Sequence, residues 1–506
     1  MNPSATPSVN HTSTLIKGVG IIFFVGMVTS ALAYLLRLIL ARRLTPDELG
    51  LFFAIYSVIL LVGWTKSFGL GSALSKFVPE YLILKDYSKI KSMLVFILSF
   101  TLLSSILVLL IAYLVPASFI NGYFKSELAK PLLLLLLIFL FIDAIVQLLS
   151  SYFLSVKFFF LYSLRDLLTK GIVVGALLLF SGFSLTEVAF LYIGSSVINL
   201  AIHLFFFFKH FPFFSSKVSL SAQTMRRWFR FSLPMTFRDL FDVLMTYTDN
   251  LILVFFRPLA EVAMYNVILP TADLLLVVGR PFGRIMFPLT SELVALHDRQ
   301  KLLFLLGKSH KYVFLLLVPL AVVVILFSKF ILTTFFGVDY TGGALALQIL
   351  TIGYLFPCLS LISYNVLLGL GRSKEAAGVT IAVNILNLVL NLLLIPFFGN
   401  FGQGYLGAII ATAIGSFISF FSFSWFLYKF LQYKPPWKEL FVTLMVGVGF
   451  LAGGYYLQGM TANVLLQIIF VALLLLLYPP TLFLFRITSL KEMKGFWDIF
   501  VRRIKV

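Results

Sequence analysis

Long runs of apolar residues, separated by short polar stretches, fill the chain from residue 15 to residue 486. A helix needs about 20 such residues to cross the roughly 30 Å hydrocarbon core of a bilayer. Barrel strands would instead alternate apolar and polar residues over short segments. The pattern therefore predicts an all-α, polytopic membrane protein with fourteen helices, at 15–41, 49–75, 92–115, 131–154, 164–182, 187–208, 231–256, 262–290, 311–328, 343–369, 376–397, 404–429, 439–458 and 462–486.

The basic residues indicate how these helices are oriented. Most of the 39 Lys and Arg fall in the N-terminal arm, in every second loop and in the C-terminal tail, and few fall in the other loops. Basic residues near spanning helices stay preferentially in the cytoplasm. We therefore expect a multi-pass protein of the plasma or inner membrane with both termini in the cytoplasm.

The longest internal loop is basic and divides the chain into two groups of helices. On this division we expect two six-helix bundles, an additional pair of helices and a basic tail that forms an amphipathic helix at the membrane surface. The expected segments are the arm 1–14, the first bundle 15–208, the linker 209–230, the second bundle 231–429, the pair 430–486 and the tail 487–506.

A short internal repeat supports two related bundles. Residues 44–52 read LTPDELGLF and residues 257–265 read RPLAEVAMY, an offset of 213 residues. In both copies an outer turn is followed by Glu, an aliphatic residue, a small residue and an aromatic residue. Because both copies begin outside, the repeat predicts a pseudo-two-fold axis along the membrane normal. Two such bundles around a central cleft are typical of alternating access.

Composition narrows the functional class. The chain is 60% hydrophobic and 12% charged, with a mean hydropathy of +1.04, whereas a soluble domain is about 25% charged. No catalytic triad, paired-carboxylate site, metal-ligand cluster or Walker motif appears at useful spacing, so we expect neither an enzyme nor a metal site. The basic residues that give the net charge of +19 lie mainly in the loops and termini. This distribution indicates contact with an anionic inner leaflet rather than with nucleic acid.

Several basic residues lie inside predicted helices, where charges are costly and often functional. Arg238, Arg280 and Arg284 fall in the cytoplasmic halves of their helices, Lys66 is near mid-depth and Arg37 is nearer the outside. One interpretation is a cationic cleft between the bundles that binds a diphosphate head group, since Arg and Lys suit phosphate oxygens. In the other, Arg238 pairs with Asp242, Arg280 or Arg284 pairs with an acid, and these pairs hold the two helices together, while Arg37 extends to the outer surface.

The predicted helix 376–397 carries Asn384, Asn387 and Asn391 at spacings of three and four, which places them on one stripe. Such amides hold helices together in membranes. They could also coordinate a cation together with Asp249.

The segment 384–415 reads NILNLVLNLLLIPFFGNFGQGYLGAIIATAIG, an Asn-rich helix followed by a Gly-rich outer turn and a GYLGA helix start. It resembles the polysaccharide transporter branch of the multidrug/oligosaccharidyl-lipid/polysaccharide exporter superfamily, which includes the O-antigen and related lipid-linked oligosaccharide flippases. Similar family patterns occur at 44–52, at Asp249, Glu261 and Tyr265, and at 369–374.

The resemblance implies a flippase that moves a polyprenyl- or dolichyl-linked oligosaccharide from the inner to the outer leaflet. It also implies glycan polymerase or glycosyltransferase partners, and a sodium ion or proton as the coupling ion. The related lipid II flippase branch has a sodium site, and by position Asp249, Asn387, Asn391 and Thr412 correspond to it. The acidic partner expected on the Asn-rich helix is absent, and Asn250 stands where the family often has a basic residue.

The main alternative is a cation-coupled multidrug exporter of the same superfamily. That function favours acids in the first bundle, where Asp143 is nearly alone beside Lys66 and Arg37. A membrane glycosyltransferase would need a sizeable extramembrane loop with carboxylates, which the sequence lacks. The glycan and the carrier lipid are not readable from the sequence.

Overall fold

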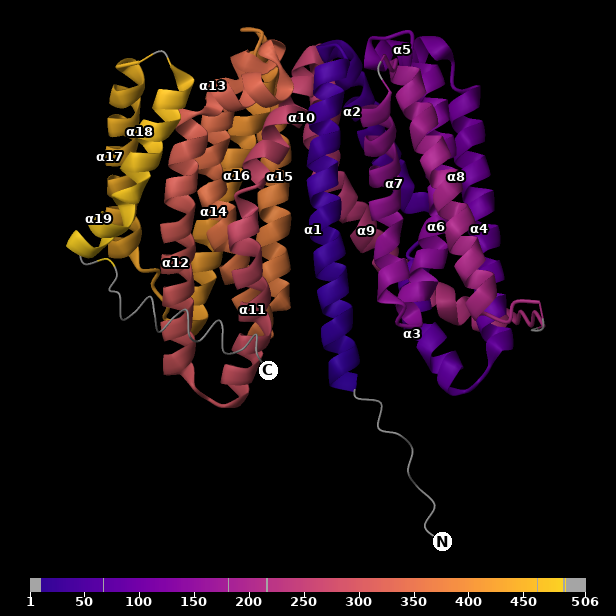
Figure 1. Ribbon diagram of the computed structural model, residues 1–506. Coiled ribbons are helices and arrows are strands. Elements are labelled where there is room, and N and C mark those ends of the chain that lie inside the picture. Colours follow the sequence, from indigo (N-terminus) through magenta and orange to yellow (C-terminus); the bar gives the residue numbers. More distant parts are fainter. Residues whose placement is uncertain are drawn as a thin grey trace. The chain divides into compact units, whose positions relative to one another are not determined.

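The structure is a computed structural model that describes residues 11–66, 68–180, 182–214, 217–461, 463–485 and 487. Most of the predicted arm 1–14 and nearly all of the tail 487–506 lie outside these residues, so the expected amphipathic tail is not described. Every regular element within these ranges is a helix, which confirms the predicted all-α class (Figure 1).

Contacts group the helices into two compact units, residues Met1–Ala263 and Met264–Val506. The first unit holds α1 (His11–Arg43), α2 (Pro46–Val62), η1 (Gly63–Lys66), α3 (Leu70–Ile83), α4 (Tyr87–Leu114), α5 (Ala117–Phe124), α6 (Ala129–Ser155), α7 (Phe159–Leu179), α8 (Leu185–His210), α9 (Ala222–Phe256) and the start of α10 (Leu259–Asp273). The second holds the rest of α10, α11 (Leu276–Ala295), α12 (Arg299–Leu326), α13 (Ser328–Ile331), η2 (Leu332–Phe336), η3 (Val338–Gly343), α14 (Ala344–Gly369), α15 (Ser373–Gly399), α16 (Gly404–Leu431), α17 (Trp437–Gly459), α18 (Val464–Leu476) and α19 (Tyr478–Leu484).

The boundary between the units lies later in the chain than the linker 209–230. Helix α9 already begins at Ala222, and it packs on α2, α3 and α5 of the first unit. Trp228, which the sequence places in the linker, is fully buried and donates its indole hydrogen to the Tyr81 hydroxyl at 3.0 Å. The six-plus-six division and the pseudo-two-fold axis stay predictions.

Eleven helices in the described ranges are long and apolar enough to cross a membrane, or twelve if the bent pair α10 and α11 forms one span. Helices α7 and α9 have the necessary length but carry more charge: α7 alone holds Arg165, Asp166 and Lys170. The chain is therefore a multi-pass membrane protein. The predicted count of fourteen is compatible with this arrangement.

The predicted continuous helix 49–75 is wrong. Helix α2 ends at Val62, a short 3-10 turn carries Lys66, and Gly69 adopts a left-handed conformation with φ +68° before α3 begins. A side chain at position 69 would also lie 2.6 Å from the Ser232 carbonyl oxygen of α9. The break thus occurs where only glycine allows both the turn and the close approach of α9.

The predicted helix 262–290 is also interrupted, with a bend of 53° between α10 and α11. Helix α11 continues without a break through Pro281 and Gly283, so the interruption does not lie there. Gly279 and Gly283 instead lie against α14, where added Cβ atoms would come within 2.9 Å of Cys358 and 3.1 Å of Asn365 and Leu361. Two small residues four apart let helix backbones approach closely, so these glycines serve packing.

The internal repeat has a direct structural counterpart. Asp47 in the first copy accepts a hydrogen bond of 3.0 Å from the backbone N–H of Ala260, the equivalent position in the second copy. Asp47 thereby caps the first turn of α10. Gly50 packs against the Leu259 carbonyl group beside it.

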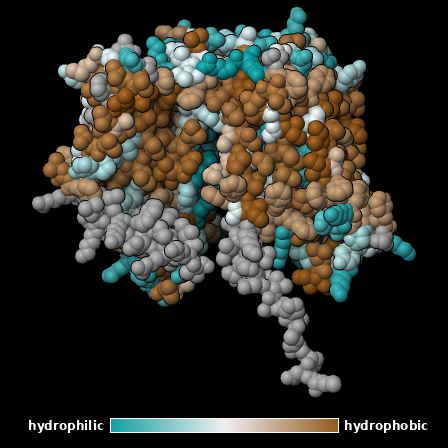
Figure 2. All heavy atoms as spheres, viewed as in Figure 1, coloured by the Kyte–Doolittle hydropathy of each residue, from teal (hydrophilic) through white to brown (hydrophobic). Residues whose placement is uncertain are grey.

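The surface of the helices fits a lipid environment. Hydrophobic side chains cover the middle of the long helices, and hydrophilic side chains gather near their ends, as the view in Figure 2 shows. Large apolar side chains such as Phe23, Phe24, Leu103 and Leu393 are more than half exposed. In water such exposure would be unfavourable, whereas in a bilayer it places apolar groups against lipid.

Candidate functional site

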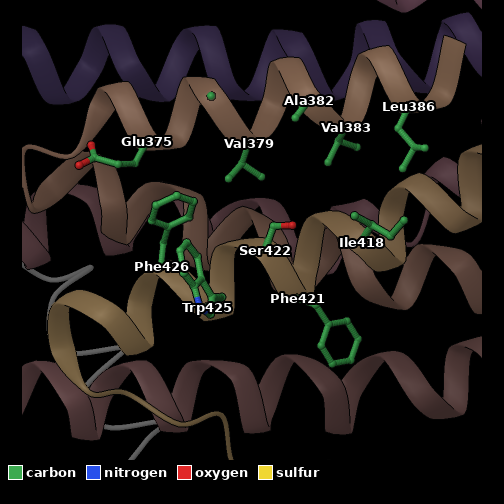
Figure 3. Close-up of a pocket in the computed structure, with 11 residues that line it drawn as sticks. Glu375, Val379, Ala382, Val383, Leu386, Ile418, Phe421, Ser422, Trp425 and Phe426 are labelled. Carbon is green, nitrogen blue, oxygen red and sulfur yellow. The ribbon is translucent and has the colours of Figure 1, made fainter. Parts of the chain in front are cut away.

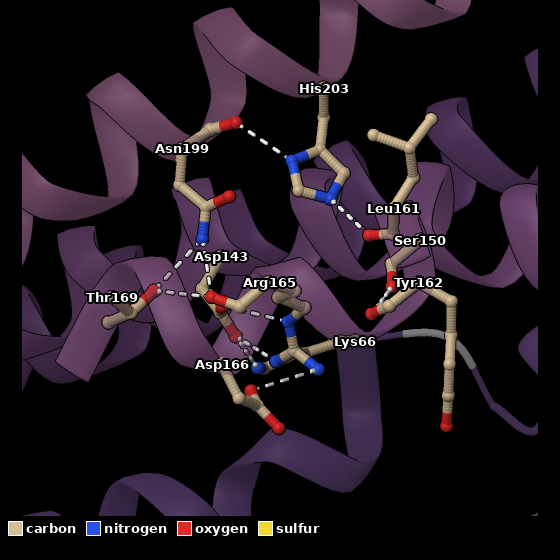
Figure 4. A network of polar contacts seen from close by, with 10 residues as sticks. All are labelled: Lys66, Asp143, Ser150, Leu161, Tyr162, Arg165, Asp166, Thr169, Asn199 and His203. Carbon is tan, nitrogen blue, oxygen red and sulfur yellow. Dashed lines mark hydrogen bonds and ion pairs between the residues drawn. The ribbon is translucent and has the colours of Figure 1, made fainter. Parts of the chain in front are cut away.

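The carboxylate of Asp143, on α6, holds two cations inside the first unit (Figure 4). Arg165 of α7 donates to it with two nitrogens, Nε to Oδ1 at 3.1 Å and Nη2 to Oδ2 at 2.6 Å. Lys66 approaches Oδ2 with its Nζ at 3.4 Å. Lys66 and Asp143 are 9% and 7% exposed. A two-pronged arginine–carboxylate contact is among the strongest polar interactions in proteins.

The break after α2 positions Lys66. Because α2 stops at Val62, the 3-10 turn directs the Lys66 side chain toward α6 rather than continuing the helical spiral. Thr65 donates to the Val62 carbonyl at 2.8 Å, and Ser104 of α4 donates to the Lys66 carbonyl at 3.4 Å. The 3-10 turn is therefore stabilised by one hydrogen bond to the end of α2 and by one from α4.

A second layer of polar groups fixes Arg165 and the turn of α7 around it. Asn199 of α8 donates to the Arg165 carbonyl at 2.8 Å and to the Thr169 hydroxyl at 3.0 Å. Asp166 lies 3.9 Å from the Arg165 guanidinium. His203, one turn after Asn199, is buried between the carbonyls of Asn199 and Leu161, which favours a structural role for it.

These groups face a cavity of about 410 Å³ inside the first unit. Its wall carries three cations and three carboxylates, together with Tyr56, Trp64 and Tyr192. The charged residues are Lys66, Arg165, Lys170, Asp143, Asp166 and Asp239. Its size suits a small ligand or a head group. Its formal charges balance, so the wall as a whole carries no excess of positive charge.

The structure brings only part of the predicted cationic set into this cavity. Lys66 lines it, while the Arg37 guanidinium lies over the Phe53 ring, 5.4 Å from its centre. The Arg238 side chain is outside the described part of the chain, although its neighbour Asp239 lines the cavity. Arg280 and Arg284 are exposed on α11 in the second unit. The predicted cleft between the bundles stays a prediction.

Arg165 is a residue that the sequence analysis missed. It lies close to the start of the predicted helix 164–182 and therefore reads as an end-of-helix residue. A usable signal was present: Arg165, Asp166 and Lys170 are three charges within two turns of one apolar segment, and Asp143 on another helix requires a cation.

The predicted ion-coupling residues also divide between the units. Asp249 belongs to α9, Asn387 and Asn391 to α15, and Thr412 to α16. Asn391 is fully buried and donates to the Asn387 side chain at 2.9 Å, which links two turns of one helix. Thr412 bonds to the Ala408 carbonyl of its own helix at 3.0 Å. Their role in coupling stays a prediction. Within the described residues, no group of three or more His, Cys, Asp or Glu could hold a metal ion.

A larger cavity of about 650 Å³ lies between α15 and α16 in the second unit (Figure 3). Its wall is almost entirely apolar, with Val379, Leu386 and Trp425 among its residues, and Glu375 at one end is the charged member. Such a wall fits hydrocarbon. It is unsuited to a phosphate, because a carboxylate repels an anion.

Comparisons with known proteins agree with this architecture. A family model described as "Polysaccharide biosynthesis protein" matches residues 15–294, and one described as "MatE" matches residues 234–393. An uncharacterized membrane protein of Methanocaldococcus jannaschii is 26% identical over 98% of the chain and 100% of its own length. A probable low-salt glycan biosynthesis flippase of Haloferax volcanii, Agl15, is 23% identical over 87% of the chain and 91% of its own length. The solved structure of the lipid II flippase MurJ in an inward closed conformation shares the fold, with a TM-score of 0.70, 18% identity and coverage of 92% of this chain and 99% of that one.

Proposed function

This chain belongs to the polysaccharide biosynthesis protein family, as the resemblance predicted, and we propose that it is a flippase for a lipid-linked oligosaccharide. It moves a polyprenyl- or dolichyl-(di)phosphate-linked glycan from the inner to the outer leaflet by alternating access. It acts as a transporter and not as an enzyme. The cell membrane is its site of action, with both termini in the cytoplasm and with polymerases or glycosyltransferases as partners.

The observation that carries the proposal is the match over residues 15–294. It is supported by a relative named as a glycan biosynthesis flippase that aligns over 87% of the chain. A partly buried arginine and a buried lysine on one cavity wall add a physical reason, since guanidinium and ammonium groups bind phosphate oxygens.

In the proposed cycle, the phosphate of the carrier lipid competes with Asp143 for Arg165 and Lys66. Asp143 keeps the two cations in position while the cavity is empty, and so limits the cost of burying them. Arg37, Arg238, Arg280 and Arg284 are proposed to extend the cationic path. The coupling ion is a sodium ion or a proton, acting through Asp249, Asn387, Asn391 and Thr412.

The second candidate is a cation-coupled multidrug exporter, which the MatE match over 234–393 favours. The site argues against it. A cationic drug needs an acid that is available to it. The three carboxylates of the wall are matched by three cations, and Asp143 already contacts both Arg165 and Lys66.

The test is translocation of a fluorescent undecaprenyl-diphosphate oligosaccharide between the leaflets of proteoliposomes. The double variant Asp143→Asn/Arg165→Gln removes one charge of each sign, and we expect it to fold and to lose most translocation. The matched control Asp86→Asn/Lys89→Gln removes the ion pair at the start of α4, outside the cavity, and should translocate normally.

Two results would contradict the proposal. Equal translocation by the cavity variant and the control would reduce Asp143 and Arg165 to structural groups. Efflux of a cationic dye without glycolipid translocation by the wild-type protein would favour the drug exporter. The double variant Arg238→Ala/Arg280→Ala tests the extended cationic path in the same assay.

A further inference from the structure

A basic cavity of about 430 Å³ lies in the second unit, at the ends of the spanning helices and apart from the site above. Its wall is formed by α12, by the segment 432–436 between α16 and α17, and by the first turn of α17. Three lysines line it against one carboxylate: Lys308, Lys311, Lys434 and Glu439. This excess of positive charge predicts an anionic ligand.

Two lysines of the cavity share one face of α12. Lys308 and Lys311 are three residues apart, so their side chains project in similar directions. Lys311 is only 7% exposed. Lys434 comes from the connecting segment on the other wall. Ammonium groups on two walls can therefore surround an anion.

A buried hydrogen-bond network holds the connecting segment in place. Tyr433 lines the cavity. Its hydroxyl lies 2.8 Å from Nδ1 of His310, and the two rings are stacked. His310 Nε2 faces the Leu359 carbonyl at 3.3 Å and the Ser363 hydroxyl at 3.1 Å. Because a carbonyl only accepts, Nε2 carries the hydrogen and Nδ1 accepts from Tyr433. The wall is thus preorganised.

A second bond ties the same segment to α12. Arg299, the first residue of α12, donates from Nη2 to the Leu431 carbonyl at the end of α16, at 2.7 Å. The segment that carries Lys434 is therefore anchored at both Leu431 and Tyr433. Its position does not depend on a ligand.

Aromatic side chains near the cavity are of the kind found at the level of the lipid head groups. Trp437 starts α17 and stacks on Phe421 with 5.6 Å between ring centres, and it is 45% exposed. Phe304, on the cavity wall, is 59% exposed. Aromatic side chains gather where a membrane meets water. A cavity with lysines inside and exposed aromatic groups at its edge suits a ligand with a charged head and an apolar tail.

We propose that this cavity binds the phosphate head group of an anionic membrane phospholipid. The lysines contact the phosphate oxygens, and the acyl chains lie along the apolar surface beside Phe304. The positive-inside pattern assigns this end to the cytoplasmic leaflet, where anionic lipids attract basic pockets between helices. The site is separate from the one proposed for the transported glycolipid and does not rest on the flippase function.

The experiment measures binding of a fluorescent phosphatidylglycerol to the purified full-length protein in detergent, with phosphatidylcholine as the neutral comparison. The variant Lys308→Gln/Lys434→Gln should weaken phosphatidylglycerol binding by about tenfold or more, since each lysine contributes on the order of 1 kcal/mol. The control Lys301→Gln/Lys374→Gln removes two exposed lysines outside the cavity and should bind as the wild type does.

The outcomes distinguish the sources of the phosphate group. Displacement of phosphatidylglycerol only by other anionic lipids supports the proposal. Saturable binding of inorganic phosphate, with no preference for phosphatidylglycerol over phosphatidylcholine, would assign the cavity to a soluble phosphate and overturn it. Equal loss of binding in the cavity variant and the control would also overturn it, because binding would then reflect total charge.

Discussion

The carboxylate of Asp143 offsets the cost of burying Lys66 and of partly burying Arg165 in the first unit. Arg165 and Lys66 lie within 2.6 Å and 3.4 Å of its oxygens, in a part of the molecule with little access to water. Desolvating three charged side chains is costly. Their mutual attraction offsets this cost only while all three remain in contact. Removing one of the three charges is therefore expected to destabilise the other two.

We expect Asp143→Asn to destabilise the protein by about 3–5 kcal/mol, because it leaves a buried lysine and a partly buried arginine without a carboxylate. The double variant Asp143→Asn/Arg165→Gln should regain most of that loss, since it removes one charge of each sign. Thermal unfolding in detergent measures both. If the single variant unfolds at the wild-type temperature, the trio is hydrated and the buried-charge argument fails.

Asp86, which caps the N-terminus of α4, gives a pH-dependent prediction. Its carboxylate accepts from the Lys89 backbone at 3.0 Å and pairs with the Lys89 ammonium at 2.7 Å, and these bonds lower the pKa of Asp86 below its usual value of about 3.9. A lowered folded-state pKa stabilises the fold above the unfolded-state pKa, and the stabilisation is lost as the pH falls through the folded-state pKa.

Asp86→Asn keeps a side chain that can cap α4 but loses the ionised form. We therefore expect the wild type to melt at a slightly higher temperature than the variant at neutral pH, and the difference to vanish as the pH falls below about 4. A difference that is constant from pH 7 to pH 3 would show that the charge contributes nothing and that capping geometry explains the effect.

Some helices of this chain pack so closely that only glycine fits at the point of contact. Gly50 of α2 is the clearest case: a Cβ atom there would lie 1.9 Å from the Leu259 carbonyl oxygen, in the first turn of α10. Backbone on both sides leaves no flexible side chain to move aside. The hydrogen bond from Ala260 to Asp47 depends on the same close approach.

We expect Gly50→Ala to separate α2 from α10 and to destabilise the protein by about 1–3 kcal/mol, as overpacked sites do. Gly26→Ala on α1 is the matched control, because nothing lies within 4 Å of a Cβ atom there; it should be neutral or slightly stabilising. Thermal unfolding of the two variants gives the comparison. Equal melting temperatures would mean that the α2–α10 contact is looser than described.

The sequence predicted elements better than it predicted their interruptions. Hydropathy averages over many residues, so it placed most spanning helices and the all-α class correctly. It could not detect the break at Gly69, which depends on the backbone of α9 arriving beside that position. It likewise did not place the 53° bend between Asp273 and Leu276, which interrupts the predicted helix 262–290. Such features are tertiary, and no local pattern contains them.

The candidate site was predictable only in part, for a related reason. Lys66 and Asp143 stand out because each is a charge in an apolar run, but their contact joins residues 77 positions apart. Arg165 looked like an end-of-helix residue until its partner was known. The short repeat was more informative than its length suggested, since positions 47 and 260 not only correspond but also touch.

That contact between equivalent positions leads to a prediction about the whole transport cycle. On the predicted division into bundles 15–208 and 231–429, Asp47 and Ala260 fall in different bundles, so alternate opening of these bundles would separate α2 from the start of α10. The Asp47–Ala260 hydrogen bond of 3.0 Å would then break once in each cycle. A covalent link at the same place should hold the outer end closed.

We expect the variant Asp47→Cys/Ala260→Cys to form a disulfide under oxidising conditions, because the Asp47 side chain already reaches the backbone of residue 260. Glycolipid translocation should stop on oxidation and return on reduction. The single variants are the controls, and the native Cys358 is buried and should not cross-link. Translocation that continues at the wild-type rate with the disulfide fully formed would mean that α2 and α10 move as one body, so that the outer opening must form elsewhere between the helices.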